Sequence, residues 1–262
     1  MKRLHLSFAC GSRTLAGTFD MAPGSTGLLL VSGGNELRSG AFSGQARLAG
    51  EIAKAGFPVF RFDRRGVGDS EGENRGFRKS EKDIRAALEA FRAIAPQVNR
   101  VVGFGNCDAA SALMLAGGAG CDGLILSNPW TIEGDEEADA TPPPDAIRAR
   151  YAEKLKNPRE IARLIKGGVD IGKLAKGVAK SLRPAARPSG LVHEMAAGLE
   201  NFQGPARILL AEADRTAQVF DSRWDKADSR ISRCAGAGHA YVEPHAREWL
   251  RQQILQAMRT SA

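Results

Sequence analysis

The sequence predicts an α/β protein in which a mostly parallel central sheet is flanked by helices and interrupted by a helical insertion. Three observations favour this fold. Short apolar runs alternate with segments whose apolar residues recur at helical spacing. A strand, a tight turn of very small residues and a helix follow one another across residues 100–117. A long stretch rich in charge, proline and glycine separates the last two strands from the others. Strands that alternate with helices favour a parallel sheet covered on both faces.

Apolar or alternating runs bounded by turn residues predict the strands. In chain order they are residues 4–8, 14–19, 27–32, 57–62, 100–103, 123–127, 206–211 and 229–234. Four helices of the core are expected between and after them. One spans residues 46–55, one follows Ser80, one spans residues 107–117, and one begins at Pro244, a residue that suits the first turn of a helix. Ser80 and Asp83 have the spacing of a capping box at the start of the second helix.

Composition bounds the class of protein. The 262 residues suit one α/β core with an insertion, and no apolar run reaches the roughly 18 to 20 residues of a membrane span. The first residues are basic but lack the apolar stretch of a signal peptide, so a cytoplasmic location is expected. The four cysteines show no paired spacing, which predicts reduced thiols and no metal site or other cofactor. Nucleic acid is a poor partner because aromatic residues make up 6% of the chain and no binding motif appears.

The insertion divides the predicted core into residues 1–128 and 205–262, with a helical lid at residues 129–204. The basic charge is concentrated in one segment of this lid, since residues 146–189 carry twelve Lys and Arg against three acidic residues, a net +9 against −2 for the rest of the chain. One interpretation is a solvated helix face above the active site. The alternative is a cationic face that meets anionic lipid headgroups or an anionic substrate. The sequence leaves the oligomeric state open.

The turn Gly105-Asn106-Cys107-Asp108-Ala109 is the most informative motif. It places a nucleophile between a strand and a helix, in the arrangement of a nucleophile elbow, with Cys107 at the tip. The sulfur would then lie at the N-terminal end of a helix, where the dipole favours a thiolate. A small buried core cysteine is the alternative interpretation.

Acyl transfer also needs a base and an acid that orients it, in the chain order nucleophile, acid, base. His239 lies on a glycine-rich loop after the last strand and is the predicted base. Asp214 follows the strand at residues 206–211 and is the predicted acid, with Glu212 and Asp221 as alternatives. Asp108, next to the nucleophile, is expected to interact with the dipole of its own helix.

The oxyanion hole should combine the backbone N–H of Asp108 with that of Asn35 or Gly34, in the loop after the strand at residues 27–32. Glu36 and Arg38 of the same loop are candidate substrate-binding residues, and they are also placed to bond each other. The loop at residues 63–72 combines glycines with Asp and Ser, and a tight, internally bonded structural turn is expected there.

These residues together resemble the α/β-hydrolase superfamily, whose fold is expected for nearly the whole chain outside the lid. More narrowly, the chain resembles the first of two hydrolase types associated with the exosortase A system. The motifs that carry this resemblance are Ser32-Gly33-Gly34-Asn35-Glu36-Leu37-Arg38-Ser39-Gly40, Phe62-Asp63-x-Arg65-Gly66-x-Gly68-Asp69-Ser70-x-Gly72, Cys107-Asp108-Ala109-Ala110-Ser111 and Asp214-x-Thr216-Ala217. The resemblance implies a setting of exopolysaccharide biosynthesis and protein sorting in Gram-negative bacteria, and names no substrate. Cysteine in the elbow is also similar to dienelactone hydrolases, but the long basic lid departs from their compact form.

The leading hypothesis is a hydrolase that cleaves a small-molecule acyl ester or thioester through an acyl-enzyme on Cys107. A close variant passes the acyl group to a sugar hydroxyl instead of water. The third hypothesis is a non-catalytic binding or scaffold protein that kept the fold. A Cys107 sulfur beyond hydrogen-bond reach of the His239 imidazole would favour that third hypothesis.

Overall fold

A computed structural model describes residues 2–133 and 190–260 of the chain. That part of the chain forms one sheet of eight strands. They are β1 (Arg3–Cys10), β2 (Arg13–Asp20), β3 (Thr26–Val31), β4 (Val59–Phe62), β5 (Arg100–Asn106), β6 (Gly123–Ser127), β7 (Ala206–Ala211) and β8 (Ile231–Cys234). Their order across the sheet is β1-β2-β4-β3-β5-β6-β7-β8. β1 and β2 pair antiparallel, as do β2 and β4, and every other neighbouring pair is parallel. The predicted mostly parallel sheet is confirmed.

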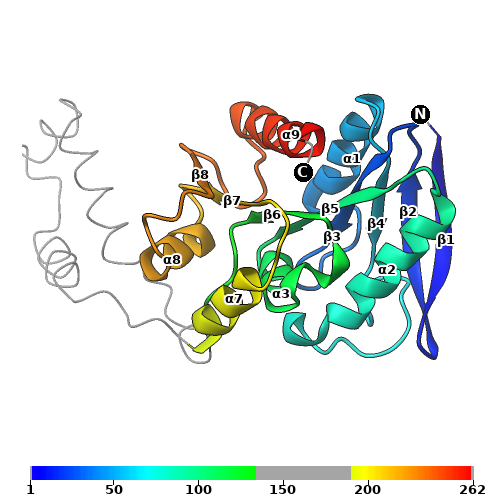
Figure 1. Ribbon diagram of the computed structural model, residues 1–262, viewed down its shortest axis with the longest axis horizontal. Coiled ribbons are helices and arrows are strands. Elements are labelled where there is room, and N and C mark those ends of the chain that lie inside the picture. The colour runs from blue at the N-terminus through cyan, green and yellow to red at the C-terminus, as the bar shows by residue number, and fades with distance from the viewer. Residues whose placement is uncertain (1, 134–189, 261–262) are drawn as a thin grey trace, which may run out of the picture.

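Helices cover both faces of the sheet (Figure 1). One face packs against α1 (Gly44–Lys54) and α9 (Pro244–Arg259). The other packs against α2 (Glu81–Ile94), α3 (Asp108–Leu115), α7 (Gly190–Glu200) and α8 (Arg215–Arg223). Short 3-10 turns occur at η1 (Ala41–Ser43), η2 (Phe77–Lys79) and η3 (Gly117–Gly120).

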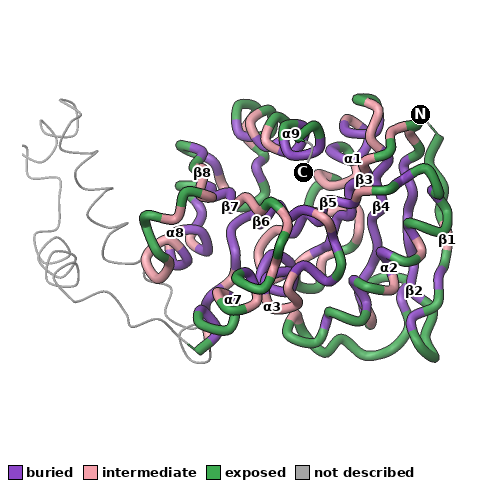
Figure 2. The backbone as a smooth tube through the Cα atoms, viewed as in Figure 1, coloured by how far each residue is buried: buried purple, intermediate pink, exposed green. Residues whose placement is uncertain are grey.

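The core is divided in two by the sheet, because successive side chains of a strand point to opposite faces. In β3, Leu28 and Leu30 pack with the residues of α1 and α9. Leu29 and Val31 pack on the other side, with α2 and α3. Every residue of β4 and β6 is buried, whereas the outward-facing residues of β1 at the sheet edge are exposed (Figure 2). The central strands are thus rigidly held, and the loops that follow them start from fixed positions.

The carboxyl ends of β3 to β8 leave the sheet at one edge, since these strands are parallel. In open α/β sheets this edge is where ligands bind. The loops that carry the predicted functional residues all start there.

The predicted strands 123–127 and 206–211 match β6 and β7 residue for residue, and α9 begins at Pro244 as expected. The predicted capping box at Ser80 is wrong. Ser80 is the N-cap residue of α2, but its hydroxyl makes no capping bond. Instead it donates to Gly76 O at 3.1 Å and accepts from Arg64 Nη1 at 3.1 Å. The Asp83 carboxylate pairs with Arg65 rather than reaching back to the helix start.

Residues 134–189 of the predicted lid, which hold its basic segment, lie outside the described residues. The described end of that insertion, α7, was not predicted. It packs beside α3 and contributes Leu191, Met195 and Leu199 to the core. Among the helices that the structure describes, none combines the length and apolar character needed to cross a bilayer.

Candidate active site

Cys107 lies at a sharp turn between β5 and α3. Its backbone has φ 61° and ψ −129°, a conformation that is rare and strained for a residue with a side chain. The turn is held because the Cys107 N–H donates to Ser127 O at 3.0 Å. A Cβ on Gly105 would lie 2.6 Å from the carbonyl carbon of Ala109, so glycine is required for α3 to pass this close to β5. Cys107 is half-buried, whereas the other three cysteines are buried.

The structure brings His239 and Asp214 together from separate loops. Asp214 follows β7 and is 7% exposed, and its Oδ2 lies 3.0 Å from His239 Nδ1. The same oxygen accepts a hydrogen bond of 3.1 Å from the Ala217 N–H, which fixes the carboxylate at the start of α8. The Cys107 side chain is the other group that interacts with the His239 ring. Nucleophile, imidazole and carboxylate therefore form one chain of interacting groups.

The electrostatics of this chain favour a charged imidazole. Hydrogen bonds to Asp214 and to Cys107 raise the pKa of His239 from 6.5 to about 10. Burial opposes this shift but is the smaller effect, and 42% of the side chain remains exposed.

The alternative acids lie elsewhere. Asp221 Oδ1 pairs with Arg233 Nη2 at 2.6 Å, and Glu212 is exposed. Two other histidines also have separate partners, since His5 Nδ1 lies 3.2 Å from Thr18 Oγ1 and His245 Nε2 lies 3.0 Å from Ala235 O.

Two asparagines hold the backbone of the histidine loop. Asn106 Nδ2 donates to His239 O at 3.2 Å, and Asn128 Nδ2 donates to the same oxygen at 3.4 Å and to Asn106 Oδ1 at 3.0 Å. Asn128 Oδ1 in turn accepts from the Ala211 N–H at 2.8 Å. Sequence reasoning missed both residues. The sequence signal that could have found them is their position, because Asn106 ends β5 and Asn128 follows β6, the strand next to it.

The predicted oxyanion loop lies against the elbow, but one predicted donor is already used. The Gly34 N–H donates to Asp108 Oδ1 at 2.6 Å. The Asn35 N–H makes no hydrogen bond to the described residues. Asp108 is the first residue of α3, where a backbone N–H has no carbonyl of its own helix to bond. Asp108 and Asn35 are therefore the pair of predicted donors that the geometry leaves available.

Arg64 is a third residue of the candidate site that the sequence reasoning missed. It lies in the loop after β4, and its Nη2 is 3.1 Å from Asp108 Oδ2 and 2.6 Å from Gly34 O. Its Nη1 donates to Ser80 Oγ. The Asp108 side chain therefore joins the oxyanion loop and Arg64. Its place in the first turn of α3 is the one expected of a helix-dipole partner, whereas its bonds to Arg64 and Gly34 were not predicted.

The predicted substrate-binding residues Glu36 and Arg38 do not bond each other. Glu36 accepts hydrogen bonds from Ala41 N and Gln45 Nε2, at 2.5 and 2.9 Å. The Arg38 guanidinium forms ion pairs with the buried Asp63 and the exposed Asp69. Glu36 therefore braces the end of its own loop, whereas Arg38 ties that loop to the loop after β4.

The loop at residues 63–72 is bonded internally, as predicted. Ser70 Oγ donates to Asp63 O at 2.7 Å and accepts from the Ala16 N–H at 2.9 Å. Gly66 N–H donates to Glu71 O at 3.2 Å.

The other three cysteines differ from Cys107. Cys10, Cys121 and Cys234 are free and buried. Desolvation raises the pKa of each thiol, to about 12 for Cys121. Cys234 belongs to the core on the α9 side of the sheet, despite lying five residues before His239.

A small cavity of about 80 Å³ lies beside the site. Asn106, Ala240, Tyr241 and Val242 line it from the nucleophile and histidine loops, and Glu36 lines it from the oxyanion loop. Within the described ranges, no three His, Cys, Asp or Glu side chains are grouped so that they could hold a metal ion.

This fold and site define a class of protein. The chain belongs to the α/β hydrolase family, whose model matches residues 28–252. The structure is similar to the esterase Pf2001 of Pyrococcus furiosus, with 14% identity, a TM-score of 0.62, and coverage of 98% of this chain and 90% of that one. It is similar to the α/β hydrolase GrgF from Penicillium sp. sh18, with 16% identity, a TM-score of 0.64, and coverage of 99% and 100%. Est1E from Butyrivibrio proteoclasticus, solved with ferulic acid bound, has 13% identity, a TM-score of 0.62, and coverage of 97% and 100%. No curated protein matches the chain in sequence.

Proposed function

We propose that this protein hydrolyses a carboxylic ester or thioester through a Cys-His-Asp triad of Cys107, His239 and Asp214. The observation that carries the proposal is the convergence of these three side chains, with Asp214 Oδ2 3.0 Å from His239 Nδ1 and the Cys107 side chain interacting with the His239 ring. Its members come from three loops at one edge of the sheet. Fold similarity to esterases supports the same reaction class.

The mechanism follows from the geometry. The Cys107 sulfur attacks the carbonyl carbon and forms a C–S bond, and the negative charge moves to the carbonyl oxygen. The backbone N–H groups of Asp108 and Asn35 stabilise that oxyanion. When the intermediate collapses, the bond to the leaving alcohol or thiol breaks, and His239 gives that group its proton.

Water then completes the cycle. His239, now neutral, takes a proton from water as the water attacks the thioacyl carbon. The C–S bond breaks, the carboxylic acid leaves, and the thiolate and imidazolium are restored. Asp214 keeps Nδ1 protonated, so that the ring presents its other nitrogen to the sulfur.

The cavity beside Asn106 and Tyr241 is our candidate for the part of the substrate that enters the protein. At about 80 Å³ it suits a small group rather than a long acyl chain.

The test is detection of the acyl-enzyme. Incubation with p-nitrophenyl acetate should give a burst of p-nitrophenol and one acetyl group on Cys107 by intact mass and peptide mapping. Cys107→Ala should remove both signals, whereas the control Cys121→Ala, at a buried cysteine outside the site, should keep them. An adduct elsewhere, or turnover that survives Cys107→Ala, would contradict the triad.

A further inference from the structure

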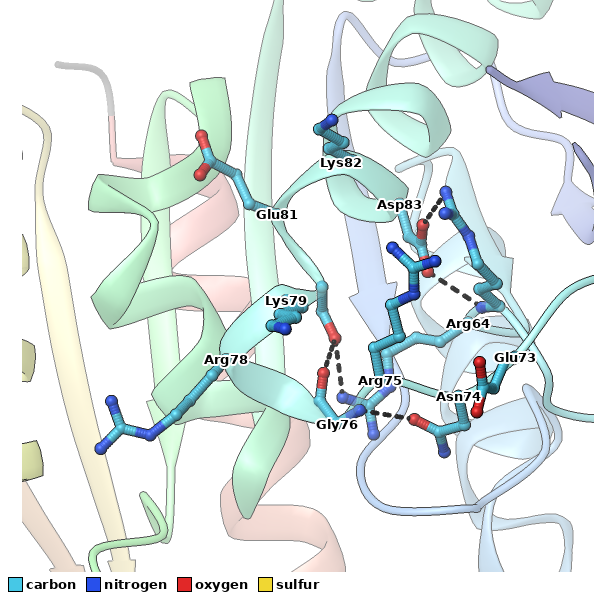
Figure 3. Close-up of a pocket in the computed structure, with 12 residues that line it drawn as sticks. Arg64, Glu73, Asn74, Arg75, Gly76, Arg78, Lys79, Glu81, Lys82 and Asp83 are labelled. Atoms are coloured by element: carbon cyan, nitrogen blue, oxygen red, sulfur yellow. Dashed lines mark hydrogen bonds and ion pairs between the residues drawn. The ribbon is translucent and has the colours of Figure 1, made fainter. Parts of the chain in front are cut away.

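A second and larger cavity of about 310 Å³ lies on the other side of the elbow loops, between the loop after β4 and the start of α2. Its lining is mainly basic, with three acidic side chains among the twelve lining residues. The basic residues are Arg64, Arg65, Arg75, Arg78, Lys79 and Lys82. Figure 3 shows this group of side chains around η2 and the first turn of α2.

Some of these charges already have partners. Arg65 pairs with Asp83 at 2.9 Å, and Arg78 pairs with Glu133 and Glu194 at 2.8 and 2.5 Å. In Figure 3, Arg78 and Glu81 both point away from Arg75. Two of the acidic lining residues already have cationic partners. Asp83 pairs with Arg65, and Glu81 pairs with Arg85 at 2.8 Å.

Three cations remain. Arg75, Lys79 and Lys82 make no side-chain hydrogen bond or ion pair with the described residues, and Glu73 is the one lining carboxylate in the same condition. Helix α2 begins at this cavity, and no side chain caps its first turn. Unpaired cations around a hollow at an uncapped helix start attract an anion.

The cavity adjoins the catalytic elbow. Arg64 forms part of its wall and is 3.1 Å from the carboxylate of Asp108, the residue after Cys107. Asn74, also in the wall, donates to the side chain of Asn35 at 2.7 Å, and Asn35 carries a proposed oxyanion donor. Arg64 and Asn74 therefore connect the cavity wall to Asp108 and Asn35, the two residues that carry the proposed oxyanion donors.

We propose that this cavity binds the phosphate group of a phosphorylated ester or thioester substrate. The substrate part of this inference rests on the proposed function, whereas the anion site stands on its own residues. Lysine and arginine would hold the phosphate oxygens by charge-assisted hydrogen bonds, which are the stronger kind. The scissile carbonyl would then reach Cys107 past Arg64 and Asn35.

The first experiment measures anion binding without catalysis. Full-length Cys107→Ala protein is titrated with inorganic phosphate, and amine labelling of Lys79 and Lys82 is followed by peptide mass spectrometry. Phosphate should protect both lysines but not Lys54, an exposed lysine at the end of α1. The double variant Arg75→Ala/Lys79→Ala should weaken phosphate binding at least tenfold, and Lys54→Ala should leave it unchanged.

The second experiment compares two esters that differ by the phosphate, monoacetylglycerol phosphate and monoacetylglycerol. In the otherwise wild-type enzyme, Arg75→Ala/Lys79→Ala should lower kcat/KM for the phosphorylated ester at least tenfold and leave the neutral ester within twofold. Phosphate binding without any preference for the phosphorylated ester would assign the site to a free anion and overturn the substrate claim. Absence of protection at Lys79 and Lys82 would overturn the site itself. Protection without hydrolysis of either ester would reject the triad and retain the anion site.

Discussion

The nucleophile elbow contacts two groups of residues that differ in chemistry. We call Cys107, His239 and Asp214 the triad flank, and Asp108, Arg64 and Gly34 the arginine flank. On the triad flank, Cys107 meets an imidazole that, in the proposed mechanism, moves protons and is oriented by Asp214. On the arginine flank, Asp108 meets a guanidinium that stays charged at any ordinary pH and a backbone N–H of the oxyanion loop. In the proposed mechanism the triad flank performs proton transfer, whereas the contacts of the arginine flank hold two loops in position. Adjacent residues of one turn, Cys107 and Asp108, divide these tasks.

The largest effect is expected on the triad flank. Cys107→Ala should lower kcat/KM for a reactive ester by at least about 10³-fold, since loss of a nucleophile removes the covalent route. Circular dichroism and the melting temperature should stay close to wild type, because the side chain is half-buried. Cys234→Ala is the matched control, and its activity should remain within a few fold. A loss of activity in Cys234→Ala equal to that in Cys107→Ala would contradict the assignment of Cys107 as the nucleophile.

Asp214→Asn should lower kcat by about 10²- to 10⁴-fold, because the imidazole loses the partner that fixes its tautomer. It should also lower the pKa of His239 from about 10 toward 6.5, since the hydrogen bond to Asp214 is the main cause of the shift. The ring protons followed by NMR between pH 5 and 11 give this value, with His239→Gln to assign the signal. Asp221→Asn, at the acid bound to Arg233, should leave both kcat and the titration unchanged.

On the arginine flank, Asp108→Ala should act on stability and activity together. Arg64, 4% exposed at its side chain, would lose its carboxylate partner. Urea unfolding should show a loss of about 2 kcal/mol, less than for a fully unpaired buried charge because Gly34 O and Ser80 Oγ still accept from Arg64. The oxyanion loop would be less well placed, and kcat should fall about tenfold.

The control for Asp108→Ala is Asp69→Ala, which removes another carboxylate paired with arginine. Asp69 is 77% exposed, so its loss should cost less than about 1 kcal/mol. Equal losses for the two variants would show that Asp108 does no more than an ordinary surface charge.

The smallest effect is the pH dependence of stability on the triad flank. Because the pKa of His239 is raised in the folded protein, its charged form stabilises the fold. This contribution is complete below the unfolded-state pKa of 6.5 and is lost as the pH rises through about 10. The free energy of unfolding of the wild type should therefore exceed that of His239→Gln at pH 6, and the difference should shrink between pH 8 and 10.5. A constant difference would contradict the pairing with Asp214.

The sequence predicted the sheet, and it singled out the three residues of the proposed triad, because both depend on local patterns. Apolar runs define β6 and β7, and the small residues Gly105 and Ala109 define the elbow. The arginine flank could not be predicted in the same way. Asp108 is separated from Gly34 by 74 residues and from Arg64 by 44, and nothing in either segment marks the contact.

The same limit explains the error at Ser80. Ser-x-x-Asp is a local signal for a capping box, but in the folded chain Arg64 takes the hydroxyl and Arg65 takes Asp83. A tertiary contact outcompeted the local one. The contribution of Asn106 and Asn128 was missed for a related reason, since their hydrogen bonds connect three neighbouring strands with the histidine loop.

The contrast among the four cysteines has a practical consequence for spectroscopy. Three thiols are buried with raised pKa values, while the fourth is accessible at the tip of the elbow. A maleimide spin label or fluorophore applied near neutral pH should attach at one native position, with no need to engineer a cysteine-free background. Distances measured from that label to a second introduced site would then report directly on movements of the loops around the elbow.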